Sequence, residues 1–97
     1  MIELHIHLEP HAGREAELER AYWQYYVPAV SVQEGFRRTV LLKRRDAVRE
    51  YQIDIAFDSE ELRLQWVASP QHQEGWPPIQ ALCARVSWTG FDAADKS

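Results

Sequence analysis

Apolar and polar residues alternate strictly at the start of the chain. The apolar positions are even-numbered and the polar ones odd-numbered: Ile2, Leu4, Ile6, Leu8 against Glu3, His5, His7, Glu9. Successive side chains of an extended chain point to opposite faces, so this pattern predicts a half-buried strand over residues 2–9. Pro10 and Gly13 follow as breakers and end the strand.

A helical period replaces the alternation between Arg14 and Val27. Apolar residues recur there every three or four positions, at Leu18, Ala21, Tyr22 and Tyr25. Glutamates occupy the early turns, where the helix dipole favours negative charge. Pro28 has no backbone N–H to donate, so it is expected to end or kink this helix.

Two further strands are predicted to form a hairpin. Gly35 opens the first strand, which runs to about Arg44, and residues 45–47 supply the turn. The second strand covers residues 48–57 and carries one continuous apolar face: Tyr51, Ile53, Ile55, Phe57.

A second helix and a last strand complete the pattern. Asp58 or Ser59 caps the helix, and Pro70 stops it. Its core-facing side is predicted to consist of Leu62, Trp66 and Ser69. A short segment follows from Pro77 to about residue 84, and residues 86–91 form the final strand.

The resulting order, β-α-β-β-α-β, is that of the ferredoxin-like fold. Right-handed crossovers place both helices on one face of a four-stranded antiparallel sheet, which makes this an α+β protein. We expect one domain over residues 1–92 and a frayed tail over residues 93–97. The second and fourth strands carry apolar residues on both faces, so a second copy, packed sheet against sheet, is expected to cover the open face.

Composition and charge exclude several classes of partner. The chain has 97 residues and a net charge of -4, so neither nucleic acid nor an anionic membrane is expected as a partner. No apolar run approaches the roughly 20 residues of a membrane span. Cys83 is the one cysteine in the sequence, which excludes an internal disulfide and a Cys-rich zinc site and suits a reducing cytoplasm.

Three segments together resemble the antibiotic biosynthesis monooxygenase family of dimeric α+β barrels. They are LEPHAGRE after the first strand, PAVSVQEGFRR before the second, and FDSEELRLQWVASPQH around the second helix. The resemblance covers nearly the whole chain, and the third segment is its most specific part. It implies a homodimer in which each subunit has a pocket between its helices and its sheet.

The pocket implied by this resemblance would have an aromatic wall that suits a flat organic ligand. The expected substrate-binding residues are Trp23, Tyr26, Leu62 and Trp76, with Tyr22 or Trp88 as further possible members of the wall. For any single ring, packing in the core is the alternative explanation.

Histidines supply the candidate acid–base chemistry. His72 follows Pro70 in what should be an exposed turn, and an imidazole titrates near neutral pH. A surface histidine without a catalytic role is the alternative. His5 and His7 share one side of the first strand, where they either join a polar network at the dimer interface or form a His-x-His metal site. Since no third ligand is evident, we expect no metal.

No organic cofactor is expected either. No Gly-rich phosphate loop follows a strand, so nicotinamide and flavin signatures are absent from the sequence. Some members of the family that this chain resembles degrade haem. Those enzymes carry a histidine ligand to the haem iron at the position where this chain has Trp76. The first strand also lacks the asparagine that they use.

The resemblance implies cofactor-independent oxygenation of a phenol or quinol of the polyketide type, with dioxygen as co-substrate. Trp66 matches the tryptophan of such relatives, whereas Leu62 stands where they carry an asparagine. Arg85 could bind the anion of the substrate. We therefore assign catalysis to His72, Trp66, His5 and Arg85.

Two other functions fit the same residues. Polyketide cyclases of the dimeric α+β barrel type resemble this chain at His72 and His5, which would perform acid–base chemistry without oxygen. A non-catalytic, dimeric ligand-binding protein is the third possibility. Oxygen uptake with a phenolic polyketide separates the oxygenase from the cyclase.

Overall fold

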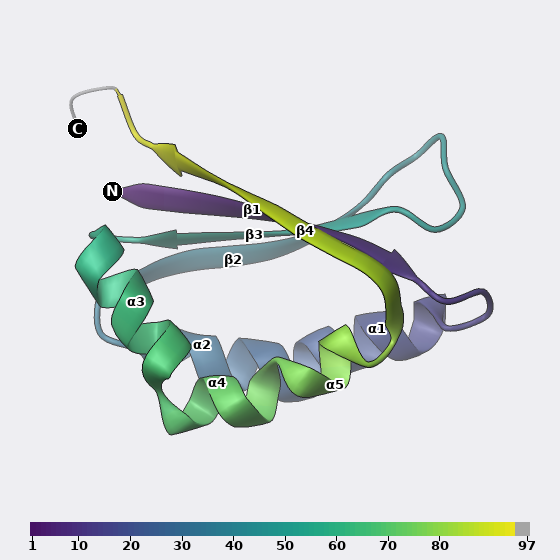
Figure 1. The fold of residues 1–97 in the computed structure, drawn as a ribbon, viewed down its shortest axis with the longest axis horizontal. Coiled ribbons are helices and arrows are strands. Elements are labelled where there is room, and N and C mark those ends of the chain that lie inside the picture. The colour runs from purple at the N-terminus through teal and green to yellow at the C-terminus, as the bar shows by residue number, and fades with distance from the viewer. Residues whose placement is uncertain (95–97) are drawn as a thin grey trace.

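The computed structural model describes residues 1–94 and confirms the ferredoxin-like α+β fold. Four strands form one sheet in the order β2-β3-β1-β4, and every neighbouring pair is antiparallel. The helices lie in a layer on one face of the sheet, and the other face is open (Figure 1). The elements are β1 (Ile2–Pro10), α1 (Glu15–Ala21), η1 (Tyr22–Tyr26), α2 (Val27–Ser31), β2 (Phe36–Lys43), β3 (Tyr51–Phe57), α3 (Glu60–Ala68), α4 (Pro70–Gly75), α5 (Pro77–Gln80) and β4 (Cys83–Asp92).

The end of the chain follows β4 directly. The N–H of Ala93 donates to the carbonyl of Met1, so residue 93, the first residue of the predicted tail, is hydrogen-bonded to the start of the chain. The rest of that predicted tail, residues 95–97, lies outside the described residues.

The strand register separates two faces that differ in chemistry. Ile6 pairs with Ile53 and Leu4 with Ile55, and all four side chains are buried beneath the helices. His5 lies opposite Asp54, on the face that the helices leave open. Because side chains alternate along a strand, the even-numbered residues of β1 face the core and the odd-numbered ones do not.

The first helical segment is longer than predicted. Pro28 is expected from the sequence to end or kink the helix, but helical structure continues past it to Ser31, so the first of these alternatives is wrong. A π-helix, η1, precedes the proline, and Pro28 lies in the first turn of α2, where a missing N–H costs little. Tyr22 and Tyr26 both lie in the core, each only 1 % exposed, whereas Tyr25, predicted on the apolar face, is 44 % exposed, so that part of the prediction is wrong.

Pro70 ends the second predicted helix, as expected, but no exposed turn follows. Ser69 terminates α3 and starts α4: its hydroxyl donates to the carbonyl of Trp66 and accepts the N–H of His72. Pro70 occupies the first turn of α4, a position that proline tolerates. His72 is therefore held in a helix.

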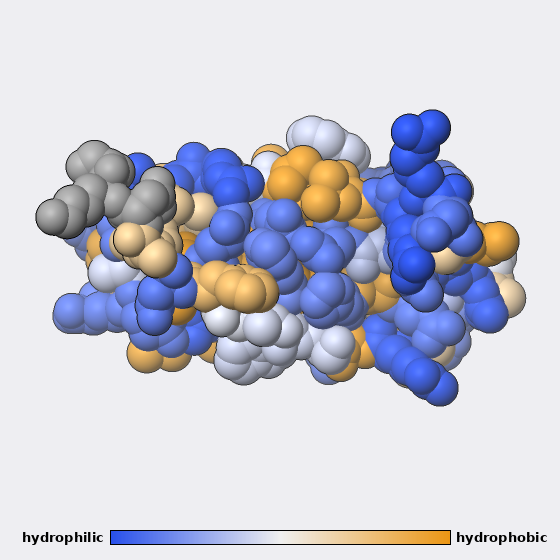
Figure 2. Space-filling view, turned by 90° about the horizontal axis from the view of Figure 1, so that it is seen from above, coloured by the Kyte–Doolittle hydropathy of each residue, from blue (hydrophilic) through white to orange (hydrophobic). Residues whose placement is uncertain are grey.

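Apolar residues occur on both faces of the edge strands, as predicted. Leu41, Val86 and Trp88 pair with core-facing residues, whereas Val40 and Phe91 lie on the open face. Figure 2 shows this open face as a mosaic of hydrophilic residues and separate hydrophobic patches. Within residues 1–94, none of the helices combines the length and the apolar character needed to span a membrane.

Candidate functional site

A cavity of about 340 Å³ lies between the sheet and the helices α3 and α4. This volume falls within the range of about 300 to 1,000 Å³ that is typical of small-molecule sites. Its wall is largely aromatic and aliphatic and consists of Leu4, Ile6, Tyr26, Arg63, Leu64, Val67, His72, Trp76, Val86 and Trp88. The structure thus provides one apolar cavity with a small number of polar groups.

His72 is the titratable imidazole of this cavity. Its ring meets the ring of Trp66 edge-on at 4.8 Å and lies 6.4 Å from that of Trp76. Burial lowers the pKa of His72 from its usual value, because a charged imidazolium loses hydration there. The imidazole is therefore neutral near pH 7 and able to accept a proton.

Tyr26 brings a phenol to the same wall from the π-helix. Its ring makes edge contacts with those of Trp66 at 5.9 Å and Trp76 at 6.4 Å. Burial is the main reason that the pKa of Tyr26 lies far above its ordinary value. The phenol therefore remains protonated and can act as a hydrogen-bond donor.

Arg63 is a functional candidate that sequence reasoning missed. It is 8 % exposed and lines the cavity, although it is charged. Two hydrogen bonds of 2.7 and 2.5 Å tie its guanidinium to Glu60, which raises the pKa of Arg63 further. The guanidinium also lies 5.7 Å from the ring centroid of Trp88. The spacing in the sequence could have identified it, because Arg63 precedes Trp66 by three residues and therefore shares its helix face.

Four of the predicted residues come together here. Tyr26, His72 and Trp76 line the cavity, and Trp66, 2 % exposed, packs behind them against two of their rings. Trp66 is thus a supporting residue of the wall. Trp88, named as a possible wall residue, also lines the cavity.

Two predicted substrate-binding residues do not reach the cavity. Trp23 is 67 % exposed and lies in a separate surface hollow with Glu19 and Gln24. Its neighbour Tyr22, 1 % exposed, occupies the core-facing position at this point of the helix. Leu62 packs against the backbone at Gly35, so close that a β-carbon there would lie 2.4 Å from its Cδ1. The assignment of both residues to the cavity is therefore corrected.

From the sequence, His5 and Arg85 are grouped with His72 as catalytic residues, and the structure separates them from it. Arg85 pairs across the sheet with Glu9, and its Nε lies 3.4 Å from the Oε2 of that glutamate on the open face. His5 lies on this face too, because its register partners are Asp54 and Thr89. Neither residue lines the cavity described above.

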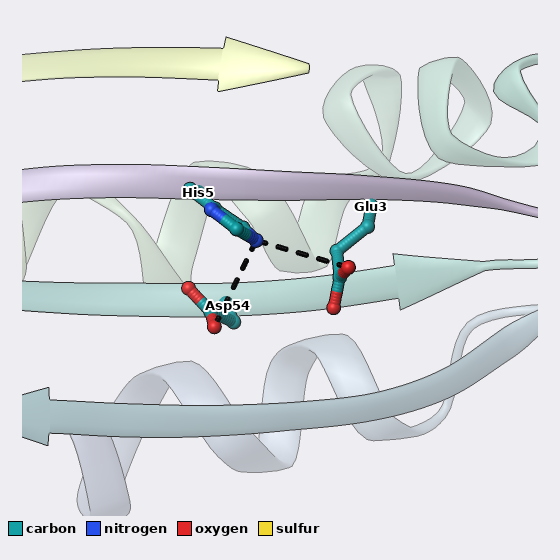
Figure 3. Close-up of side chains that lie close together, drawn as sticks. All are labelled: Glu3, His5 and Asp54. Atoms are coloured by element: carbon teal, nitrogen blue, oxygen red, sulfur yellow. Dashed lines mark ion pairs between the residues drawn. The ribbon is translucent and has the colours of Figure 1, made fainter. Parts of the chain in front are cut away.

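Around His5 the open face carries an ionic cluster (Figure 3). The Nε2 of His5 is 3.7 Å from Glu3 and 3.9 Å from Asp54, and the three donor atoms lie within 4.8 Å of one another. Asp54 also accepts a hydrogen bond from Gln52, and Glu3 is paired with Arg38. A cation could be held here, but the described carboxylates already have partners, so the cluster forms a polar network across three strands.

This network differs from the His-x-His alternative. His7 pairs with Gln52 and Ser87, and it does not belong to the group of converging donors. The ring of His5 packs instead on Phe91, with centroids 4.6 Å apart.

The chain matches a known family and several solved structures. The sequence model described as antibiotic biosynthesis monooxygenase matches residues 1–76. SnoaB, a cofactor-independent oxygenase from Streptomyces nogalater, is 20 % identical, with a TM-score of 0.86 and coverage of 98 % of this chain and 94 % of SnoaB. Rv0793 from Mycobacterium tuberculosis is 16 % identical, with a TM-score of 0.83 and coverage of 99 % of this chain and 97 % of Rv0793. A search of curated proteins finds no match.

Proposed function

Because the chain belongs to the antibiotic biosynthesis monooxygenase family, we propose that it is a cofactor-independent monooxygenase acting on a phenolic, polyketide- or quinol-type small molecule. One observation carries the proposal: a neutral imidazole, His72, lies on the wall of an apolar and aromatic cavity. The similarity to SnoaB, which is a cofactor-independent oxygenase, supports this reaction type.

The substrate supplies the electrons in this reaction. His72 takes a proton from a phenol or from an activated C–H group, which leaves an electron-rich carbanion or phenolate. Its carbon forms a bond to dioxygen, and the resulting peroxide takes up a proton. Cleavage of the O–O bond releases water as the carbon loses its second hydrogen and becomes a carbonyl. One oxygen atom enters the product and the other enters water, so no external reductant is needed.

The largely apolar lining of the cavity supports these steps. Aliphatic and aromatic walls such as Val67 and Trp76 exclude water and admit dioxygen and a flat ring. Tyr26 keeps its proton and can donate a hydrogen bond to developing negative charge. A substrate positioned between these groups is oxidised without a metal, flavin or haem.

A homodimer formed through the open sheet face is part of the proposal. Val40, Leu42 and Phe91 are 36 %, 44 % and 46 % exposed there, and a second copy would cover them. The ionic cluster around His5 would then lie in the interface, away from the catalytic cavity. The protein is proposed to act in the cytoplasm, because its lone cysteine suits a reducing compartment.

The structure weakens the cyclase alternative. That reaction required His5 and His72 to act across one pocket, and within one subunit the sheet separates them. A ligand-binding protein without turnover keeps the cavity and remains the competing function. It would bind aromatic molecules without consuming oxygen.

Oxygen consumption tests the proposal directly. A hydroxyanthrone is a suitable probe because its methylene hydrogens are acidic and its oxidation yields a quinone. We expect oxygen uptake, one quinone per dioxygen, and a rate that His72→Ala lowers at least about a hundredfold. Binding of the probe without uptake beyond the enzyme-free rate would favour the ligand-binding protein.

A further inference from the structure

Arg63 distinguishes this cavity from a plain apolar pocket. We propose that Arg63 binds a carboxylate of the substrate, so the substrate class is a phenolic aromatic acid. This inference rests on the proposed function for the identity of the reaction, and it adds the charge of the substrate and the residue that recognises it.

The placement of Arg63 is costly without a ligand role. Taking a guanidinium out of water is unfavourable unless it is paired, and its side chain is 9 % exposed. Glu60 is the described ion-pair partner, and its own side chain is 46 % exposed. Water therefore screens the carboxylate more than the guanidinium, and of the two charges only that of Arg63 belongs to the cavity wall.

The hydrogen bonds of Arg63 leave one side of its guanidinium available. Glu60 accepts from Nε and Nη2, which uses two of the five N–H groups. Within residues 1–94, Nη1 makes no hydrogen bond, and no side-chain nitrogen is both fully buried and unpaired. Nη1 is therefore accessible, on a residue that lines the cavity. A second carboxylate can bind Nη1 and Nη2 in the same bidentate manner.

Neighbouring residues fix the guanidinium before any ligand arrives. Glu60 holds it from one turn earlier in α3, and its Cζ lies over the ring of Trp88, 5.7 Å from the ring centroid. Such fixation lowers the entropy lost on binding. The indole of Trp88 and the rings around His72 provide aromatic contact surface along the same wall. A ligand with an aromatic body and a carboxylate satisfies both parts of the cavity.

A purely structural role is the alternative for Arg63. In that case its pair with Glu60 would stabilise the start of α3, and the charge of the ligand would not matter. The two roles differ in ligand selectivity, which folding stability does not affect.

Tryptophan fluorescence titration with two matched probes separates these roles. The probes are 1-hydroxy-2-naphthoate and 1-naphthol, which share a phenolic ring system and differ in the carboxylate. The wild type should bind the acid at least about tenfold more tightly, as expected for a charge-assisted hydrogen-bond pair. Arg63→Met should remove this preference and leave the affinity for 1-naphthol unchanged. Arg63→Lys keeps the charge without the fork and should retain part of the preference.

Arg85→Met is the matched control, since it removes an arginine from the open face and should leave both affinities unchanged. If Arg63→Met does not fold, as judged by circular dichroism, Glu60→Gln provides the second variant and should strengthen binding of the acid. Equal affinities of the wild type for the two probes, or an equal loss of both in Arg63→Met, would overturn the inference. Selective acid binding without oxygen uptake would instead overturn the proposed function alone.

Discussion

The imidazole of His72 meets the indole of Trp66 edge-on, with ring centroids 4.8 Å apart, although a helix break separates them in the chain. Ser69 makes this contact possible. Its hydroxyl bonds the carbonyl of Trp66 and the N–H of His72, so a single residue closes α3 and opens α4. The contact ties the candidate base to the aromatic core.

Replacing His72 by alanine tests its role as base. General-base catalysis contributes about 10² to 10⁴ in rate, so His72→Ala should lower turnover of a hydroxyanthrone at least about a hundredfold. The side chain is half-buried against Trp66, so we expect a stability loss of only about 1 kcal/mol. Gln73→Ala, an exposed change on the same helix, is the control and should affect neither quantity. Full activity of His72→Ala would refute the assignment.

The pH dependence of stability reports on the same imidazole. Burial depresses the pKa of His72 in the folded state, so the unfolded chain binds a proton more readily. The contribution of His72 to the free energy of unfolding is fully present above about pH 6.5, which is its pKa in the unfolded chain. This contribution is lost as the pH falls through the lower pKa of the folded state. Urea unfolding at several pH values should therefore show a steeper loss on acidification for the wild type than for His72→Gln. Parallel curves would show that the folded and unfolded pKa values are equal.

Trp66 and Trp23 form a matched pair of aromatic positions. Trp66→Ala removes a fully buried ring and should lower the free energy of unfolding by about 3 to 5 kcal/mol, together with activity. Trp23 is 67 % exposed, so Trp23→Ala should change stability by at most about 0.5 kcal/mol and leave turnover intact. Chemical denaturation and oxygen-uptake assays measure both. A large loss of activity in Trp23→Ala would return this residue to the substrate site.

Removal of metal ions should leave the activity unchanged. The converging donors Glu3, His5 and Asp54 lie on the open face, away from the cavity of His72. Dialysis against a chelator, followed by the oxygen-uptake assay, checks this expectation. Activity that is lost on chelation and restored by one metal would show that this cluster, or another donor set, serves the reaction. His5→Ala should then abolish the restoration if this cluster holds the ion.

A homodimer is expected in solution, at twice the subunit mass of 11.4 kDa. Light scattering at micromolar concentration measures this mass. Leu42→Glu places a charge on the open face, where burial against a second copy would be costly, and should yield monomers. Trp23→Ala alters the helix-side surface and should leave the dimer intact. A monomeric wild type would contradict the proposed interface.

The order of elements could be predicted from the sequence because each depends on local periodicity. Alternation along residues 2–9 established β1 and its core face, and a cap at Asp58 or Ser59, which the structure places at Ser59, and Pro70 marked the ends of α3. The π-helix at Tyr22–Tyr26 could not be predicted in this way. Across this wide turn the core receives Tyr26 in place of Tyr25, a tertiary effect that overrides the helical period read from the sequence.

The candidate site was predictable only in part, for the same physical reason. Trp66 and His72 are close in the chain, so their proximity follows from the short α3–α4 corner, which the sequence marks with Ser69 and Pro70. The sequence by itself thus determined the fold, the family and one corner of the cavity. The position of His5 depends on strand register, where one residue decides the face, and only tertiary structure assigned it to the open side. Tertiary packing likewise placed Arg63 beside Trp88, because contacts between distant segments leave no local pattern in the sequence.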